Sequence, residues 1–201
     1  MPMQQTLFSS LDNDFFCYRR GFIAPGEAKL LLSRLWEQLA WQQHEIRMFG
    51  RRVAQPRLSA WYGAAEARYR YSGLQLDPLP WHPLLFDLKA RLAAQLQQDF
   101  NSVLANAYRE GRDSMGWHSD DETELGPRPL VASVSLGADR RFLVRKKGDS
   151  RAASLWLECG SLLVMKRGCQ EIYQHSVPKT QKSIGLRINL TFRQINNQPP
   201  P

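Results

Sequence analysis

Two stretches in the first half of the chain carry apolar residues at helical spacing. From Glu27 to Trp41 the leucines and a tryptophan recur every three or four positions, and a second series of leucines runs from Pro83 to Leu96. A helix with this spacing has one apolar side to bury, and proline is favoured in its first turn because the missing N–H has no partner there. We therefore predict two amphipathic helices. The stretch between them, at about 45–80, is rich in Gly, Pro, Arg and aromatic residues and favours hairpins and loops.

After Asp99 the pattern changes to short strand-like runs with turn residues between them. The runs are 103–109, 130–136, 140–146, 154–157, 161–166, 171–177 and 184–193. Many short strands without intervening helices are typical of an antiparallel barrel or a two-sheet jelly roll. We expect an α+β, mainly β fold: a double-stranded β-helix, or jelly roll, with the N-terminal helices packed outside.

The last run alternates completely between apolar and polar side chains. One face carries Leu186, Ile188, Leu190 and Phe192, and the other carries Arg187, Asn189, Thr191 and Arg193. If this strand is central, its arginines are enclosed, which is costly unless anions meet them. Planar guanidinium groups bind carboxylates through two hydrogen bonds, so two arginines suit a dicarboxylate such as 2-oxoglutarate. The alternative is a solvent-facing strand with scattered arginines.

Two histidines and an aspartate have the composition of an open metal site. On an extended strand, residues two apart point to the same side, so His118 and Asp120 are expected to converge on one ion, with His175 arriving from another strand. Three such ligands leave adjacent positions free, as a non-haem Fe(II) oxygenase requires for its co-substrate and O2. The alternative is a polar strand end and a core histidine with satisfied hydrogen bonds.

Charge and cysteine content limit the partners and the compartment. Lys and Arg number 27 against 19 Asp and Glu, a net charge of +8, which favours a polyanionic partner. The three cysteines, Cys17, Cys159 and Cys169, have no CxxC spacing, and the chain shows neither a signal segment nor an apolar run long enough for a membrane. We expect a monomer in the cytoplasm, or in the nucleus of a eukaryote, with no membrane partner.

Five motifs together resemble those of the AlkB family of Fe(II)- and 2-oxoglutarate-dependent dioxygenases, and most closely its AlkB homologue 2 branch, which repairs duplex DNA. The motifs are Asn106-Ala107-Tyr108, His118-Ser119-Asp120-Asp121-Glu122, the run 132–137, His175-Ser176-Val177-Pro178 and the run 187–193. The resemblance implies that His118, Asp120 and His175 are the catalytic iron ligands. It also implies that 2-oxoglutarate is bound by Asn106, Tyr108, Arg187, Asn189, Thr191 and Arg193.

The same resemblance implies a reaction and a partner. O2 converts 2-oxoglutarate to succinate and CO2 while an N-methyl group of 1-methyladenine or 3-methylcytosine is hydroxylated and leaves as formaldehyde. We expect one dioxygenase domain over residues 1–201, with a nucleotide-recognition lid at about 45–80 and a jelly-roll core at about 100–195. The expected substrate is alkylated DNA, single- or double-stranded. The alternatives are an RNA demethylase or protein hydroxylase of the same class, or a basic nucleic-acid-binding module without chemistry.

The lid region offers residues for a base removed from its stack. A methyl on a Watson–Crick nitrogen is unreachable inside a duplex, so the base must be flipped out or already be single-stranded. Phe49 lies at an apolar tip among arginines that include Arg51, which suits a wedge whose flanks hold phosphates, although a hairpin with a packed Phe has the same pattern. A Pro-Arg pair containing Arg57 follows, and the resemblance extends to it.

Aromatic and acidic residues complete the expected substrate site. Tyr69 and Tyr71 alternate with arginines and are followed by Ser72, so a base can stack there, although a half-buried edge strand would look alike. Asp121 and Glu122 follow the metal carboxylate. An anionic side chain favours 1-methyladenine and 3-methylcytosine because these bases are cationic, whereas a solvated acidic loop is the alternative.

Overall fold

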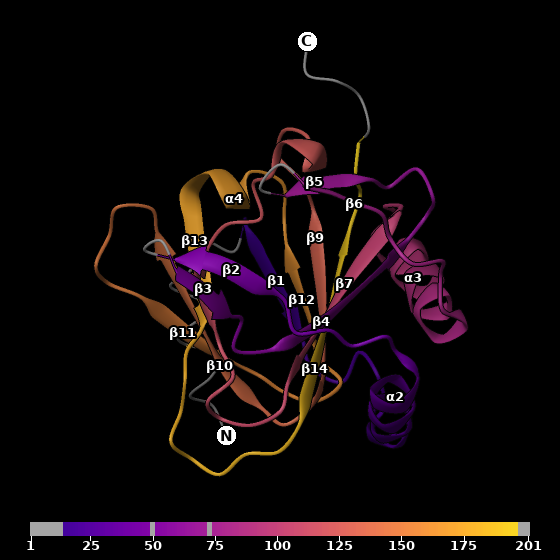
Figure 1. Ribbon diagram of the computed structural model, residues 1–201, viewed down its shortest axis with the longest axis horizontal. Helices are drawn as coiled ribbons and strands as arrows, with labels where there is room; N and C mark the ends of the chain where they lie inside the picture. The colour runs from indigo at the N-terminus through magenta and orange to yellow at the C-terminus, as the bar shows by residue number, and fades with distance from the viewer. Residues whose placement is uncertain (1–13, 49–50, 72–73, 197–201) are drawn as a thin grey trace.

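The body of the fold is two antiparallel sheets that face each other (Figure 1). The computed structural model describes residues 14–48, 51–71 and 74–196, with side chains described only outside 46–51 and 69–76. The larger sheet has the order β1 (Phe16–Arg19), β12 (Leu162–Met165), β9 (Val131–Gly137), β14 (Arg187–Arg193), β7 (Ser102–Tyr108) and β4 (Leu58–Gly63). The smaller has the order β11 (Ala153–Leu157), β10 (Arg140–Lys146), β13 (Tyr173–Val177) and β8 (Met115–His118).

Apolar side chains from both sheets meet between them in a single cluster. It contains Phe16, Tyr108, Val131, Leu163 and Met165 from the larger sheet and Phe142, Val144, Leu155, Leu157, Tyr173 and Val177 from the smaller. Such a sandwich of antiparallel strands is the arrangement of a jelly roll. The predicted fold class is therefore confirmed.

Two helices cover the outer face of the larger sheet, as predicted. Helices α2 (Pro25–Gln38) and α3 (Pro83–Leu96) each begin at a proline and lie on the same side of the molecule in Figure 1. Their buried residues are Ala28, Leu31, Leu35, Leu85, Leu88 and Leu92. These side chains share a core cluster with the apolar row of β14, so the helices are held by the burial of leucines on strand side chains.

Strand β14 lies in the middle of the larger sheet, paired with β7 on one side and β9 on the other. Its apolar row, which includes Ile188, Leu190 and Phe192, packs toward the helices. The polar row must then face the smaller sheet, because successive side chains of a strand alternate between its faces. The expectation of a central strand with an enclosed polar row is confirmed.

The predicted strands differ from the observed ones in several places, and three of these differences have a simple physical reason. Strand β1 was missed because its four residues are too few to show a period. The start of the run 171–177 is helical: α4 spans Cys169–Ile172 because Gly168, at φ 86°, reverses the chain before it. The run 184–193 becomes a strand only at Arg187, which pairs with the last residues of β7 and β9, Tyr108 and Gly137, so no ladder partner precedes it.

Two hairpins occupy the stretch between the helices, as expected. Strand β2 (Glu45–Met48) pairs with β3 (Arg51–Ala54), and β5 (Tyr69–Tyr71) pairs with β6 (Leu74–Leu76). A short 3₁₀ helix, η1 (Thr123–Leu125), follows β8. Within the ranges that the structure describes, no helix has both the length and the apolar character needed to span a membrane.

Candidate metal and co-substrate site

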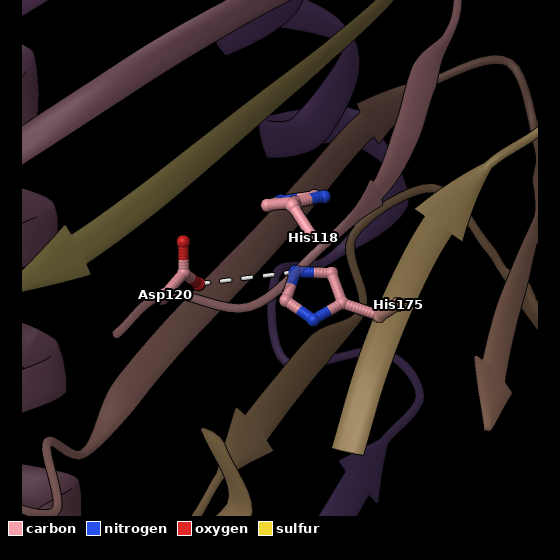
Figure 2. Close-up of side chains that lie close together, drawn as sticks. All are labelled: His118, Asp120 and His175. Carbon is pink, nitrogen blue, oxygen red and sulfur yellow. Dashed lines mark ion pairs between the residues drawn. The ribbon is translucent and has the colours of Figure 1, made fainter. Parts of the chain in front are cut away.

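Three potential metal ligands converge between the sheets. One ligand atom each from His118, Asp120 and His175 lies within 4.8 Å of the others. The histidines are directly opposite each other on the paired strands β8 and β13, and their ring centroids are 4.1 Å apart. Figure 2 shows Asp120 turned toward His175, with Oδ2 3.9 Å from Nε2. Two imidazoles and one carboxylate on one side of an ion suit Fe(II), with further coordination positions left open.

The His118 ring is oriented by its own strand. Its Nδ1 lies 2.9 Å from the carbonyl oxygen of Gly116, so Nδ1–H donates to this carbonyl in the neutral ring. The lone pair is then on Nε2, which leaves this nitrogen free to bind a metal. The local sequence thus selects the nitrogen that is available to an ion.

Asp120 reaches the cluster by a different route from the one expected. Strand β8 ends at His118, so the argument that i and i+2 share a strand face was wrong for Asp120, and Asp121 has no strand face either. Instead, the backbone N–H of Asp120 donates to Oε1 of Gln170 on α4 at 3.0 Å, and Arg193 donates to Oδ1 at 2.5 Å. Asp120 therefore lies in a bend after the strand, and the bonds to Gln170 and from Arg193 hold its backbone and its carboxylate in place.

Burial and charge determine the protonation of these ligands. Burial by itself raises the pKa of Asp120, but the positive charges of Arg193 and the two histidines outweigh it and lower this pKa to about 2. Burial and the neighbouring His118 lower the pKa of His175 to about 3. Near neutral pH the site therefore has an ionised carboxylate and a neutral imidazole, and no proton has to leave either group when a metal binds.

We predict that the metal-free protein loses stability as the pH falls from about 6.5. The unfolded chain binds a proton at His175 near pH 6.5, whereas the folded protein does so only near 3, so the contribution is complete above 6.5 and is lost toward 3. Asp120 adds a second loss between its unfolded value, 3.8, and about 2. His175 should give a slope of up to about 1.4 kcal/mol per pH unit.

Urea unfolding with a metal chelator across this pH range measures the effect. His175→Gln should remove the slope between pH 6 and 4. His44→Gln, which replaces an exposed histidine, should retain it. An unchanged slope in His175→Gln would contradict the assignment.

Arg187 is a buried cation with unused hydrogen-bonding capacity. Its side chain is 1% exposed, and one nitrogen, Nη2, donates to Oγ of Ser135 at 3.0 Å. Nε and Nη1 are buried without a hydrogen-bond partner among the described residues. Burial lowers its pKa to about 10, so the guanidinium is still charged near neutral pH. A buried charge with hydrogen-bond donors left over fits a carboxylate ligand.

The other predicted co-substrate residues lie around Arg187 on β7 and β14. Tyr108 is opposite Arg187, and Asn106 is opposite Asn189, in the pairing of the two strands. The Tyr108 ring lies 5.1 Å from the Arg187 guanidinium. The Asn189 amide donates to Oγ of Ser133 at 2.8 Å, and Thr191 Oγ1 donates to Asn189 Oδ1 at 3.3 Å. All six predicted residues, including Arg193, therefore belong to two neighbouring strands of one sheet.

The predicted substrate residues are placed less completely. Asp121 is exposed and forms an ion pair with Lys147 at 2.9 Å. Glu122 is partly buried, and Arg57 turns inward, where its Nε donates to Oδ1 of Asn106 at 3.0 Å. Outside this description are Phe49 and Ser72 entirely, and the side chains of Arg51, Tyr69 and Tyr71.

Sequence reasoning missed the residues that support the site. Gln170 lies just before the predicted strand run 171–177, and nothing in the local pattern indicates that it supports Asp120. Ser133 and Ser135, both on β9, bind Asn189 and Arg187. Their signal was present in the sequence, since the two serines alternate with the apolar Ala132, Val134 and Leu136 in the same way as the polar row of β14.

Comparisons with known proteins agree with this geometry. The family model described as the 2OG-Fe(II) oxygenase superfamily matches residues 15–193. The human alpha-ketoglutarate-dependent dioxygenase alkB homolog 3 is 41% identical over 193 residues, covering 91% of this chain and 67% of that protein. The human DNA oxidative demethylase ALKBH2 is 42% identical over 159 residues, covering 75% of this chain and 60% of that protein. The chain thus spans about two thirds or less of the length of these relatives.

A solved structure supports the fold independently. The structure of OsALKBH1 superposes with a TM-score of 0.64 at 20% sequence identity, covering 89% of this chain and 97% of that one. The AlkB resemblance is confirmed, and it extends to alkB homolog 3 as well as to ALKBH2. The cofactor is Fe(II), the co-substrates are 2-oxoglutarate and O2, and the cluster of His118, Asp120 and His175 is consistent with the iron site. The chain belongs to the 2OG-Fe(II) oxygenase superfamily, among the homologues of AlkB.

Proposed function

We propose that this chain repairs DNA by oxidative demethylation of N-alkylated bases, with 1-methyladenine and 3-methylcytosine as substrates and formaldehyde as a product. One observation supports this most strongly: an open set of two histidines and a carboxylate is bonded to Arg193 of β14, and the polar row of the same strand carries the enclosed Arg187, two of whose nitrogens have no hydrogen-bond partner among the described residues. The names of two relatives, a dioxygenase alkB homolog and a DNA oxidative demethylase, support nucleic acid as the substrate.

The ligand and co-substrate residues would divide the work as follows. His118, Asp120 and His175 hold Fe(II), which with O2 and 2-oxoglutarate supplies the oxidising power for hydroxylating the methyl carbon. Arg187 binds the distal carboxylate of 2-oxoglutarate, and Tyr108, Asn189 and Thr191 line the same face. Arg193 keeps Asp120 ionised and oriented, and with Asn106 it faces the keto-acid end. The protein residues would thus contribute by positioning the metal and the co-substrate and by supplying charges that bind them.

The substrate would enter beside the hairpins. We propose that the hairpins within residues of about 45–80 form a nucleotide-recognition lid on a single dioxygenase domain over residues 1–201. The jelly-roll core of about 100–195 is completed by β1 and β4, which pair with its larger sheet. Phe49 would enter the base stack, Arg51 would hold phosphate, and Tyr69, Tyr71 and Ser72 would line the base pocket. Asp121 and Glu122 would favour a cationic base, with Lys147 as the counterion of Asp121 in the free protein. We further propose that the protein is a monomer. We also propose that it works in a reducing compartment, which is supported by its three free cysteines.

Formaldehyde release from methylated oligonucleotides tests the proposal. We expect turnover that requires Fe(II), 2-oxoglutarate and O2, and that is at least about 10-fold faster on 1-methyladenine than on 1-methylguanine, because only the former is cationic near neutral pH. Single- and double-stranded substrates should be compared in wild type and Phe49→Ala, which should be impaired mainly on duplex if Phe49 is the wedge.

Competition separates the alternatives. Methylated DNA, methylated RNA and a peptide are offered together, and the substrate consumed fastest identifies the class. Faster turnover of RNA or of peptide would contradict the DNA assignment while leaving the oxygenase chemistry in place. Binding of DNA without uptake of iron or of 2-oxoglutarate would instead indicate a non-catalytic module.

A further inference from the structure

The side chain of Arg57 turns inward, toward a residue of the larger sheet. Arg57 comes just before β4, which pairs with β7 so that Leu58 is opposite Ala107 and Ser59 is opposite Asn106. Its Nε donates to Oδ1 of Asn106 at 3.0 Å in a partly buried contact. An arginine that follows the β2–β3 hairpin is thus bound to a residue of the co-substrate face.

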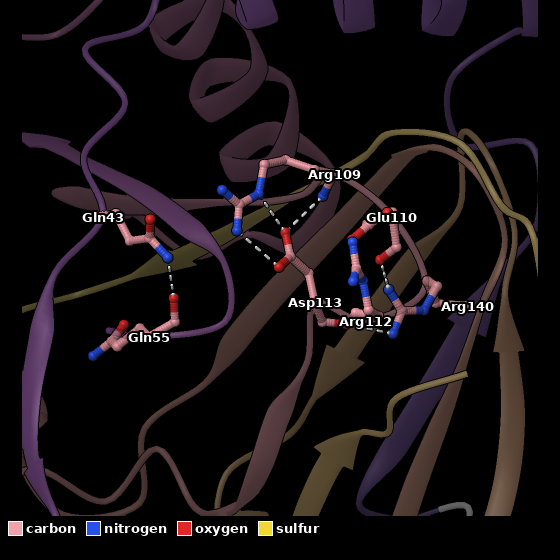
Figure 3. Close-up of polar contacts among 7 residues, drawn as sticks. All are labelled: Gln43, Gln55, Arg109, Glu110, Arg112, Asp113 and Arg140. Carbon is pink, nitrogen blue, oxygen red and sulfur yellow. Dashed lines mark hydrogen bonds and ion pairs between the residues drawn. The ribbon is translucent and has the colours of Figure 1, made fainter. Parts of the chain in front are cut away.

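The backbone that carries Arg57 is held in place from several sides. Gln43 donates from Nε2 to the carbonyl of Gln55 at 2.9 Å, as Figure 3 shows, and the N–H of Gln55 donates to the carbonyl of His44 at 2.8 Å. The N–H of Ser114 donates to the carbonyl of Pro56 at 2.8 Å. Each bond fixes the chain one or two residues before Arg57.

The loop that receives Pro56 is itself rigidly bonded. Asp113, next to Ser114, accepts hydrogen bonds from the backbone N–H, Nε and Nη2 of Arg109, at 2.8 to 2.9 Å (Figure 3). Arg140, which is 2% exposed, donates to the carbonyl of Asp113 at 2.8 Å. The position of Arg57 is therefore defined by packed structure and not by a free surface loop.

The contact between Arg57 and Asn106 fixes which end of the Asn106 amide faces Arg57. Arginine can only donate hydrogen bonds, so it binds the oxygen of the Asn106 amide and never its nitrogen. The NH2 group of Asn106 is then directed away from Arg57, and it donates to none of the described residues. Asn106 is 5% exposed and lies opposite Asn189 on β14. The amide thus offers two N–H donors at the face where an anionic co-substrate would lie.

We propose that Arg57 is a positioning residue for 2-oxoglutarate: it fixes the orientation of the Asn106 amide so that its NH2 group faces the co-substrate. This inference rests on the proposed role of Asn106. Without Arg57 the amide can rotate by half a turn and present its oxygen to a carboxylate, which would repel it. Arg57 acts through Asn106 and does not touch the methylated base.

Binding of 2-oxoglutarate without O2 is the direct test, because it needs neither DNA nor turnover. Titration of the Mn(II)-loaded protein by calorimetry should show about 10-fold weaker 2-oxoglutarate binding in Arg57→Met, as expected for loss of one oriented bond to a charged group. Arg57→Lys, which can still donate to Oδ1, should recover part of the loss. Mn(II) affinity and thermal unfolding should stay near wild type. Arg34→Met, an exposed arginine on α2, is the matched control and should bind 2-oxoglutarate normally.

A double-mutant cycle with Asn106→Ala tests the route. In the Asn106→Ala background, Arg57→Met should cause no further loss of 2-oxoglutarate affinity, because the amide that it orients is gone. Additive losses would overturn the proposal. So would unchanged 2-oxoglutarate affinity in Arg57→Met together with a raised KM for oligonucleotide, which would make Arg57 a nucleic-acid contact. If wild type bound no 2-oxoglutarate, the proposed function would fail as well, whereas normal wild-type binding with a silent Arg57→Met would remove only this inference.

Discussion

Replacing His118 with alanine is expected to reduce formaldehyde release by at least about 1,000-fold, because the metal supplies the oxidising chemistry and one of its three protein ligands is lost. Only His118, Asp120 and His175 form a metal-binding cluster among the residues that the structure describes. Within the described ranges, no second cluster of this kind can therefore take over the ion when the imidazole is missing. The loss should appear in kcat and should persist at saturating 2-oxoglutarate.

Metal binding gives a second readout of the same substitution. Mn(II) affinity measured by calorimetry should fall by at least about 10-fold in His118→Ala. His44→Ala, which removes an exposed histidine outside the cluster, should change neither metal affinity nor turnover. Undiminished turnover in His118→Ala would show that the iron is held elsewhere.

Replacing Arg187 with methionine is expected to have opposite effects on co-substrate binding and on stability. Binding of 2-oxoglutarate should weaken by about 100-fold, because a bidentate contact to a carboxylate in a buried site is lost. The metal-free, ligand-free protein should unfold no more easily, and its free energy of unfolding should rise by about 1 kcal/mol. The reason is that the wild-type guanidinium is buried with Nε and Nη1 unpartnered among the described residues, and an apolar side chain of similar length has no such cost.

Two titrations and two melting curves check this prediction. In wild type, saturating 2-oxoglutarate should raise the unfolding temperature by mass action, and in Arg187→Met the same concentration should raise it much less. Arg187→Lys keeps the charge but loses the planar fork, so its affinity should lie between the two. A marked destabilisation of ligand-free Arg187→Met would mean that Arg187 is a structural cation and not a ligand waiting for an anion.

The alternation within a single strand was enough to predict the co-substrate face. In β14 the apolar and polar residues follow a period of two without exception. Its two faces are enclosed because the helices cover one side of the larger sheet and the smaller sheet lies on the other. The helices were also predictable, because a leucine every third or fourth residue has only one way to be buried on a flat sheet. Local patterns of this kind are determined by backbone geometry alone.

Asp120 shows that the local sequence pattern does not predict how a side chain is held in the site. Residue types and spacing indicated Asp120 correctly, yet the strand argument behind it was wrong, because β8 ends two residues earlier. What holds Asp120 is Gln170, 50 residues downstream, and Arg193, 73 residues downstream. Contacts over such separations depend on how the sheets pack, and no periodicity in the chain records them.

By itself, the sequence determined the two helices, the jelly-roll class and the polar row of β14, because each depends on residue type at fixed short spacing. It also indicated His118, Asp120 and His175 as candidate iron ligands by residue type. The tertiary structure alone decided that Gln170 shapes the bend at Asp120, that Arg187 has donors left over, and that Arg57 turns inward to Asn106. The physical reason is that hydrogen-bond partners and burial are properties of the space between packed elements. That space exists only once distant segments have been brought together.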